Sequence, residues 1–236
     1  MVTLVLQHMP GEDAGLFAQV MQADGVAFEV LELDAGAALP DLDSFQRLLV
    51  LGGAQQVWET DKYPWLQGEI DFIRRWVQEG RPYFGVCLGH QLLTVALGGE
   101  VGLAAEEELG FPRVDIDPTA RDHPVLGVLP DSGYWLQWHS AEVKQVPDGL
   151  QVLGSSSICP VQVLSGGPAV VSLQFHAEGN RARVEHWTGP TDAGRAMRED
   201  HGQPEVDRVL AEAAQHLVEA QASSAAMFRR WLQLPL

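Results

Sequence analysis

Apolar residues in the first half of the chain follow two alternating patterns, short continuous runs and stripes of helical spacing. The runs, which predict strands, lie at 2–7, 47–51 and 82–86, and the alternation of apolar and polar residues at 28–33 predicts a further strand. The stripes, in which apolar residues recur three and four positions apart, predict helices at 12–23, 65–79 and 88–97. Strands that alternate with helices are typical of an α/β fold with an open, mostly parallel central sheet and helices on both faces.

The second half of the chain contains more strand-like runs than helical stripes. Further strands are predicted at 114–116, 135–138, 151–153, 161–164 and 170–175. Beyond Pro204, which suits the first turn of a helix, apolar spacing predicts one or two terminal helices. No linker rich in Pro, Gly, Ser or charge divides the chain. We therefore expect one main domain over 1–190 and a C-terminal helical extension over 191–236 packed on it.

The net charge of the chain argues against two classes of binding partner. Fifteen Lys and Arg residues against 32 Asp and Glu residues give a formal net charge of −17. A surface this acidic repels phosphate backbones and anionic lipid headgroups, so we expect neither nucleic acid nor membrane as a partner. No run of about 18 apolar residues is present, so no membrane span is expected either.

The cysteines and the N-terminal apolar run indicate in which cellular compartment the protein is expected. The sequence has two cysteines, Cys87 and Cys159, and no Cys-x-x-Cys motif. Residues 1–6 lack the basic region and cleavage site of a signal peptide, and we interpret them as a strand. A reducing, cytoplasmic location is the simplest interpretation, and there a single cysteine can act as a nucleophile. The sequence suggests no cluster of metal ligands, so we expect neither a metal nor an organic cofactor.

The segment Gly85-Val86-Cys87-Leu88-Gly89 lies between a predicted strand and a predicted helix. Gly-x-Cys-x-Gly in that position has the form of a nucleophile elbow, a sharp turn that needs small residues beside its strained centre. The turn places the Cys87 sulfur at the carboxyl edge of the sheet and at a helix N-terminus, which favours a thiolate. The amide of Leu88 faces the same space and can bind an oxyanion. Taken alone, the pattern fits a buried cysteine beside a glycine-rich turn equally well.

A thiolate nucleophile also needs a base, and the segment Gln174-Phe175-His176-Ala177-Glu178 supplies one after an apolar run. Residues two apart on a strand share a face, so we expect His176 and Glu178 to be neighbours, with the carboxylate fixing the tautomer of the histidine. A lone His-x-Glu is more often a polar strand end. Combined with the elbow, it predicts that Cys87, His176 and Glu178 form a catalytic triad.

These segments resemble the class I (triad) glutamine amidotransferases. Residues 85–93 are similar to the nucleophile segment of that family, residues 174–178 to its His/Glu segment, and Gly52-Gly53 to its oxyanion loop. The resemblance covers roughly residues 1–180 and is greatest to stand-alone members that are similar to the glutaminase domain of GMP synthase, γ-glutamyl peptidase-like proteins included. It implies a flavodoxin-like fold and makes 1–190 the catalytic domain.

The resemblance also implies roles for individual residues. The amides of Gly53 and Leu88 would form the oxyanion hole. The residues implied to bind or border the substrate are Gln91, Gly52, Glu108, His139 and Ser140. A purely structural position at a strand end is an equally open interpretation for His139 and Ser140.

Two departures from the family pattern stand out. Ala177 occupies the position between His and Glu where most members have proline, which leaves both reacting groups in place. In addition, the 236 residues contain no phosphate-cradling loop of an ATP-dependent synthase, so we do not expect them to make GMP by themselves.

The sequence thus leaves three functions open. The first is a Cys-His-Glu hydrolase that cleaves glutamine or another γ-glutamyl amide and releases ammonia or an amine. The second is an amidotransferase subunit that delivers ammonia to a separate synthase. The third is a binding or regulatory module without activity, against which the intact triad argues. A homo-oligomer is also possible, although the apolar stripe of a terminal helix more often packs on its own domain.

Overall fold

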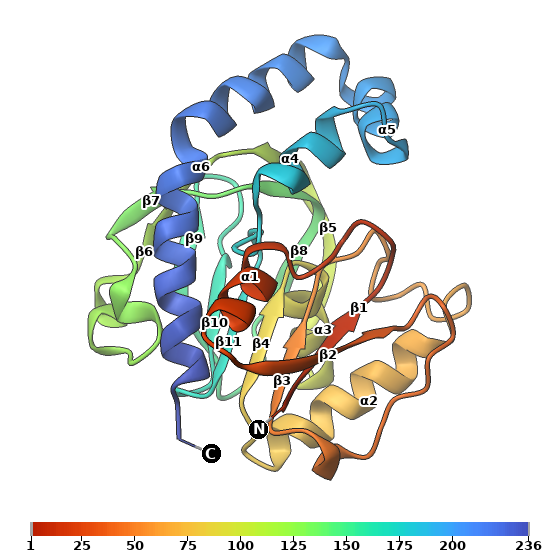
Figure 1. The fold of residues 1–236 in the computed structure, drawn as a ribbon, viewed down its shortest axis with the longest axis vertical. Coiled ribbons are helices and arrows are strands. Elements are labelled where there is room, and N and C mark those ends of the chain that lie inside the picture. The colour runs from red at the N-terminus through yellow and green to blue at the C-terminus, as the bar shows by residue number, and fades with distance from the viewer. Residues whose placement is uncertain (1, 236) are drawn as a thin grey trace.

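Short runs rich in Val, Leu and Phe form the strands in the middle of the molecule (Figure 1). The computed structural model describes residues 2–235. The strands are β1 (Val2–Gln7), β2 (Ala27–Glu32), β3 (Arg47–Val50), β4 (Tyr83–Val86), β5 (Glu100–Gly110), β6 (Arg113–Ile116), β7 (Ser132–Tyr134), β8 (Gln137–Gln145), β9 (Gln151–Ser156), β10 (Val163–Ser165) and β11 (Val170–Leu173). The helices are α1 (Gly15–Ala23), α2 (Trp65–Gln78), α3 (Leu88–Ala96), α4 (Arg181–Thr188), α5 (Asp192–His201) and α6 (Gln203–Leu232).

The main sheet has the strand order β2-β1-β3-β4-β11-β10-β9-β6-β7. Its first five strands pair in parallel, and the strands from β10 onward extend the sheet by antiparallel pairing. Strands β5 and β8 form a separate two-stranded sheet. The α/β fold with a largely parallel central sheet is therefore confirmed, and the sequence did not indicate its antiparallel side.

Helices cover both faces of the sheet because neighbouring residues of each strand point to opposite sides. On β1, Val5 belongs to one apolar cluster, while Leu4 and Leu6 belong to another. The first cluster includes side chains of α1 and of the C-terminal half of α6. The second includes side chains of α2 and α3. This alternation explains why β1, β3 and β4 are continuous apolar runs, whereas β2 at the edge of the sheet is largely exposed.

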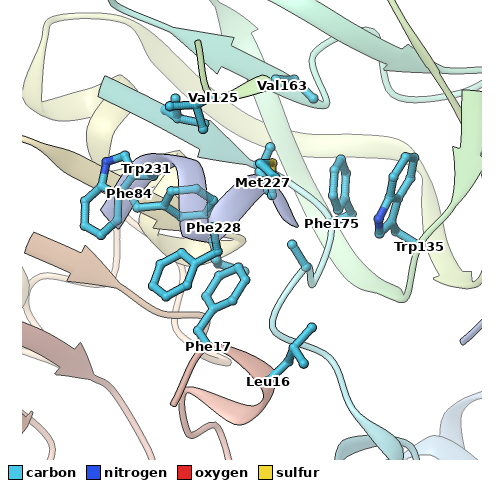
Figure 2. Close-up of a cluster of buried hydrophobic side chains, with 14 of the residues drawn as sticks. Leu16, Phe17, Phe84, Val125, Trp135, Val163, Phe175, Met227, Phe228 and Trp231 are labelled. Atoms are coloured by element: carbon cyan, nitrogen blue, oxygen red, sulfur yellow. The ribbon is translucent and has the colours of Figure 1, made fainter. Parts of the chain in front are cut away.

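Aromatic side chains attach the last helix to the core (Figure 2). Phe228 of α6 stacks on Phe17 of α1 with ring centroids 4.0 Å apart. Its ring also meets Phe84 of β4 edge-on at 5.5 Å, and Trp231 packs on both Phe84 and Phe228. The C-terminal half of α6 thus shares a core with the sheet, while its N-terminal half packs near α4 and α5 (Figure 1).

The structure differs from the sequence-based elements in several places. Residues 135–136 precede β8 and do not belong to it, and one long helix, α6, forms where one or two were expected. Two shorter helices come before it: α4 lies within the expected main domain of 1–190, and α5 lies within the region expected to be a helical extension. Strand β5 was not predicted, because its sequence is rich in Glu and only its last three residues are buried.

None of the helices within residues 2–235 combines the length and the apolar character that crossing a membrane requires.

Candidate active site

Cys87 sits in the tight turn between β4 and α3, as the elbow motif predicts. It has φ 49° and ψ −102°, and among residues 2–235 it is the single non-glycine residue with a positive φ. Its neighbours must be small, because a Cβ at Gly89 would lie 2.3 Å from the carbonyl oxygen of Val50, and one at Gly85 would lie 2.8 Å from backbone atoms of Gly89. Strain of this kind persists only where the surrounding structure imposes it, and it is typical of functional sites.

His176 and Glu178 are neighbours, but the expected strand geometry is wrong. Strand β11 ends at Leu173, and residues 177–178 form a turn. The turn is closed by a hydrogen bond from the amide of Gly179 to the carbonyl oxygen of His176, at 3.0 Å. It brings Glu178 Oε1 to 2.7 Å from Nδ1 of His176, and both side chains are buried.

The sulfur of Cys87 also acts on this histidine. Burial opposes a charge on His176, but the Glu178 carboxylate and the Cys87 sulfur outweigh it and raise the pKa of His176 to about 10. The ring is thus an imidazolium at neutral pH. The side-chain amide of Gln174 approaches the same sulfur from another direction, with Nε2 3.6 Å from Sγ.

The loop after β3 closes the site from the other side. A Cβ at Gly52 would lie 2.9 Å from Cε1 of His176 and 3.5 Å from Cβ of Cys87. A Cβ at Gly53 would lie 3.0 Å from the side chain of Leu88. Within residues 2–235, the amides of Gly53 and Leu88 have no hydrogen-bond acceptor. The two amides predicted to bind an oxyanion are thus unpaired next to the elbow.

A buried histidine supports this loop, and sequence reasoning missed it. His8 directly follows β1, and its Nδ1 lies 2.9 Å from the carbonyl oxygen of Gly52. Its Nε2 lies 2.9 Å from Oε1 of Glu69 on α2, and neither side chain is exposed. Although burial opposes a charge on His8, Glu69 outweighs it and raises the pKa of His8. The one sequence signal was a polar Gln-His pair at the end of an apolar strand, which carried no assigned role.

A cavity of about 690 Å³ opens over these groups. Of the residues predicted to form the site, those that line the cavity are Cys87, His176, Gly53, Gln91, His139 and Ser140. Its other lining residues come from the loops after β1 and β3, from β5 and β8, and from α4 and α5. The remaining predicted residues, Glu178, Leu88, Gly52 and Glu108, lie behind this first layer.

Gln91, predicted to hold substrate, is already engaged by protein groups. Its Nε2 donates to the carbonyl oxygen of Ala141 at 3.1 Å and to Oε1 of Gln174 at 3.2 Å. Since both hydrogens of the amide are used, Gln91 links α3 to β8 beneath the cavity and leaves its oxygen for other contacts.

Glu108 and His139 form a buried pair below the cavity wall. His139 Nε2 lies 3.0 Å from Oε2 of Glu108, and His139 Nδ1 lies 3.0 Å from the carbonyl oxygen of Ala141. Ser156 and Gln162 also donate to the Glu108 carboxylate. This network fixes β8, on which His139 and Ser140 reach the cavity.

Cys159 completes a trio with Glu108 and His139 whose ligand atoms lie within 4.8 Å of one another. The Glu108 carboxylate accepts hydrogen bonds from Ser156 and Gln162 and is paired with His139, and burial raises the pKa of the Cys159 thiol to about 12. The trio is therefore better described as a hydrogen-bonded support.

Comparison with known families agrees with this geometry. The family model described as "Glutamine amidotransferase class-I" matches residues 15–185. The glutamine amidotransferase-like protein YfeJ of Salmonella typhimurium is 30% identical over 182 residues, which cover 75% of this chain and 76% of that protein. A glutamine-hydrolyzing GMP synthase subunit of Methanothermobacter thermautotrophicus is 37% identical over 106 residues, 44% of this chain and 55% of that protein. The matched region thus spans about half the length of the GMP synthase subunit.

Solved structures show the same fold over the whole chain. A glutamine amidotransferase from Thermotoga maritima superposes with a TM-score of 0.87 at 23% identity, covering 99% of both chains. One from Methylobacillus flagellatus gives a TM-score of 0.80 at 23% identity, covering 98% of this chain and 94% of the other. The helices after residue 180 therefore belong to a fold found elsewhere.

Proposed function

We propose that this chain, which belongs to the class-I glutamine amidotransferase family, hydrolyses a γ-glutamyl amide through a thioester on Cys87. The observation that carries the proposal is the convergence of three features in one cavity. These are a strained cysteine at a helix N-terminus, a charged His176–Glu178 pair, and the unpaired amides of Gly53 and Leu88.

In the first step, the Cys87 thiolate attacks the side-chain carbonyl carbon of the substrate. A sulfur–carbon bond forms, and negative charge moves to the carbonyl oxygen, where the amides of Gly53 and Leu88 receive it. Donors of this kind are each worth about 100- to 1,000-fold in rate. The carbon–nitrogen bond then breaks as the His176 imidazolium gives its proton to the departing amine, leaving a γ-glutamyl thioester.

In the second step, neutral His176 takes a proton from water, and the resulting hydroxide attacks the thioester carbonyl. The carbon–sulfur bond breaks, glutamate leaves, and the thiolate and the imidazolium are regenerated. Glu178 keeps the ring in one orientation during both steps and stabilises its positive charge. No step requires a group that these side chains and water do not supply.

The direct test is ammonia release from glutamine by the purified chain, with Cys87→Ala as the control. Release that depends on Cys87 supports hydrolysis, and mass spectrometry of a quenched reaction should detect the glutamyl adduct on the wild-type chain alone. If neither glutamine nor a panel of γ-glutamyl amides reacts, the hydrolase proposal is wrong.

A second candidate is supported by the names of the relatives. Several are named as glutamine-hydrolyzing subunits of GMP synthase, and such a subunit implies a synthase partner. On this alternative, ammonia release from glutamine rises when a synthase chain is added and the two chains co-elute in size-exclusion chromatography. The elution volume of the chain alone also reports a homo-oligomer. Activity at full rate without a partner favours the self-contained hydrolase.

The third alternative, a binding or regulatory module, requires that the chain still bind a glutamyl ligand while no thioester forms. Cell fractionation tests the cytoplasmic location that the cysteine pattern predicts.

A further inference from the structure

The cavity next to Cys87 has a wall that hydrolysis of glutamine does not require. We call it the helical wall, and it consists of His186 and Trp187 of α4 and Asp192, Ala193 and Ala196 of α5. Glutamine releases only ammonia, which needs no binding surface of its own. A cavity of about 690 Å³ lies in the range that accommodates drug-sized ligands and is more than a glutamyl group fills.

The helical wall begins beside the group that protonates the departing nitrogen. The ring of Trp187 lies 4.9 Å from that of His176, edge to face at 89°. The ring of Trp138 on β8 follows, 5.3 Å from Trp187 at 81°, and it is partly exposed to the cavity. A substituent on the departing nitrogen therefore extends along two tryptophans and the small side chains of α5, a surface that suits an aromatic body.

The charges that line the cavity select against an anionic substituent. Glu12, Glu107 and Asp192 line it, Glu12 being paired with the buried Arg183, and among residues 2–235 no lysine or arginine lines it. Three histidines line the cavity: His139 and His176 are already paired with Glu108 and Glu178, and the third is His186 of the helical wall. A carboxylate on the leaving group would thus approach Glu107 and Asp192 with no lysine or arginine beside it, which opposes its binding.

We propose that the preferred substrate is the γ-glutamyl amide of an aromatic amine that carries no carboxylate. This inference rests on the proposed hydrolase function and adds the class of leaving group. In the overall reaction, the amide and one water give glutamate and the free amine, with the proton of the amine supplied by His176. Peptides such as γ-glutamyl amino acids are poor substrates because their leaving groups end in a carboxylate.

A matched set of substrates tests the proposal on the wild-type chain. γ-Glutamyl-2-phenylethylamide and γ-glutamylphenylalanine share the same aromatic body and differ by one carboxylate, and glutamine lacks the body. We expect kcat/KM for the phenylethylamide to exceed that for each of the other two substrates by about tenfold or more. Glutamine lacks the buried aromatic contact, and γ-glutamylphenylalanine brings an unpaired charge. Equal values, or a preference for the carboxylate, would overturn the proposal.

Variants locate the effect on the cavity wall. Trp138→Ala should lower the ratio of kcat/KM for the phenylethylamide to that for glutamine by about tenfold. The matched control is Trp58→Ala, since Trp58 is 46% exposed and does not line the cavity, and this variant should keep the wild-type ratio. A ratio that Trp138→Ala leaves unchanged would contradict the proposal.

A charge variant tests the selection against anions. Glu107→Gln keeps an acceptor for the Trp138 indole N–H, which donates to Glu107 Oε1 at 3.1 Å, but removes the charge. It should raise kcat/KM for γ-glutamylphenylalanine about threefold relative to the phenylethylamide, as expected for one partly exposed charge. An unchanged ratio would contradict the role of this charge.

The two proposals fail in different ways. Cys87-dependent hydrolysis of glutamine without preference for the phenylethylamide would overturn the leaving-group inference alone. The absence of Cys87-dependent release from every substrate would overturn both.

Discussion

The Nδ1 atom of His8 lies 2.9 Å from the carbonyl oxygen of Gly52, whose peptide bond carries the amide of Gly53 on its opposite side. In a trans peptide the C=O and N–H groups point in opposite directions, and no peptide bond within residues 2–235 is cis. A hydrogen bond from His8 to this carbonyl therefore aims the Gly53 amide away from His8. His8 is a positioning residue for the proposed oxyanion hole, and Glu69 holds His8 in turn.

The first prediction concerns this pair. His8→Gln should lower kcat for γ-glutamyl hydrolysis at least tenfold with little change in KM, because a misdirected oxyanion donor weakens binding of the transition state more than that of the substrate. Steady-state kinetics give the two parameters separately. Glu69→Gln is the matched variant, since its amide can still hydrogen-bond His8, and it should lose less activity than His8→Gln.

If His8→Gln raised KM and left kcat intact, His8 would serve substrate binding rather than the oxyanion. The melting temperatures of both variants show whether either effect reflects a loss of folded protein.

The second prediction concerns the pH dependence of His176. Its pKa of about 10 lies above the ordinary value of 6.5, so the imidazolium that protonates the leaving amine persists up to about pH 10. We expect kcat/KM to fall on the alkaline side as the ring loses its proton near that pH. Glu178→Gln removes a charge that raises this pKa, so it should move the alkaline limb to lower pH and lower kcat by about 100- to 10,000-fold.

The same shift has a consequence for stability. A group with a raised folded-state pKa contributes stability in full below its unfolded pKa, and loses that contribution as pH rises through the folded pKa. The wild type should therefore have a higher free energy of unfolding than His176→Gln. This difference should be largest below about pH 6.5 and should shrink toward pH 10. Urea denaturation of both chains across this range measures it, and a difference that grew with pH would contradict the assignment.

The third prediction tests how closely the loop after β3 approaches the histidine. Gly52→Ala would place a methyl group 2.9 Å from Cε1 of His176, and the ring would have to move away from Cys87. We expect kcat/KM to fall by about 100-fold or more while the chain stays folded, because a misplacement of about 1 Å costs that much.

Gly68→Ala is the control for this substitution. Gly68 lies within α2, and a Cβ there would meet no atom closer than 3.9 Å. The change should leave activity intact and stabilise the fold by about 0.5–1 kcal/mol, since alanine replaces glycine within a helix.

The fourth prediction concerns the C-terminal helix. Phe228→Ala removes a ring that is fully buried between Phe17 and Phe84, and should lower the free energy of unfolding by about 3–5 kcal/mol. Val218→Ala on the same helix is the control, because Val218 is 78% exposed and its truncation should change stability by no more than about 0.5 kcal/mol. Chemical denaturation followed by tryptophan fluorescence gives both values.

Truncation after residue 190 tests the predicted division of the chain. Because α6 contributes Met227, Phe228 and Trp231 to the core beneath β1, β3 and β4, the shortened chain should not fold cooperatively. A cooperative unfolding transition of residues 1–190 would instead support a separable extension.

Local patterns in the sequence were enough to predict the α/β framework and the cysteine. Continuous apolar runs that alternate with helices indicate a sheet that is buried on both faces. Strands β1, β3 and β4 form at these runs. The glycines at 85 and 89 and the strained backbone at Cys87 belong to one short segment, so their relationship is contained in the sequence itself.

The tertiary structure decided how the other groups reach that cysteine. His8 and Glu69 are 61 residues apart and meet because β1 and α2 pack together, which no local pattern encodes. The pairing of His176 with Glu178 depends on a turn beyond the end of β11, where a strand-based rule does not apply. The helical wall could not be predicted from the sequence, because α4 and α5 are largely polar helices. Their contact with the cavity depends on how the chain folds as a whole. Short-range periodicity reports which side of an element is buried, whereas contacts between distant elements depend on the packing of the whole chain.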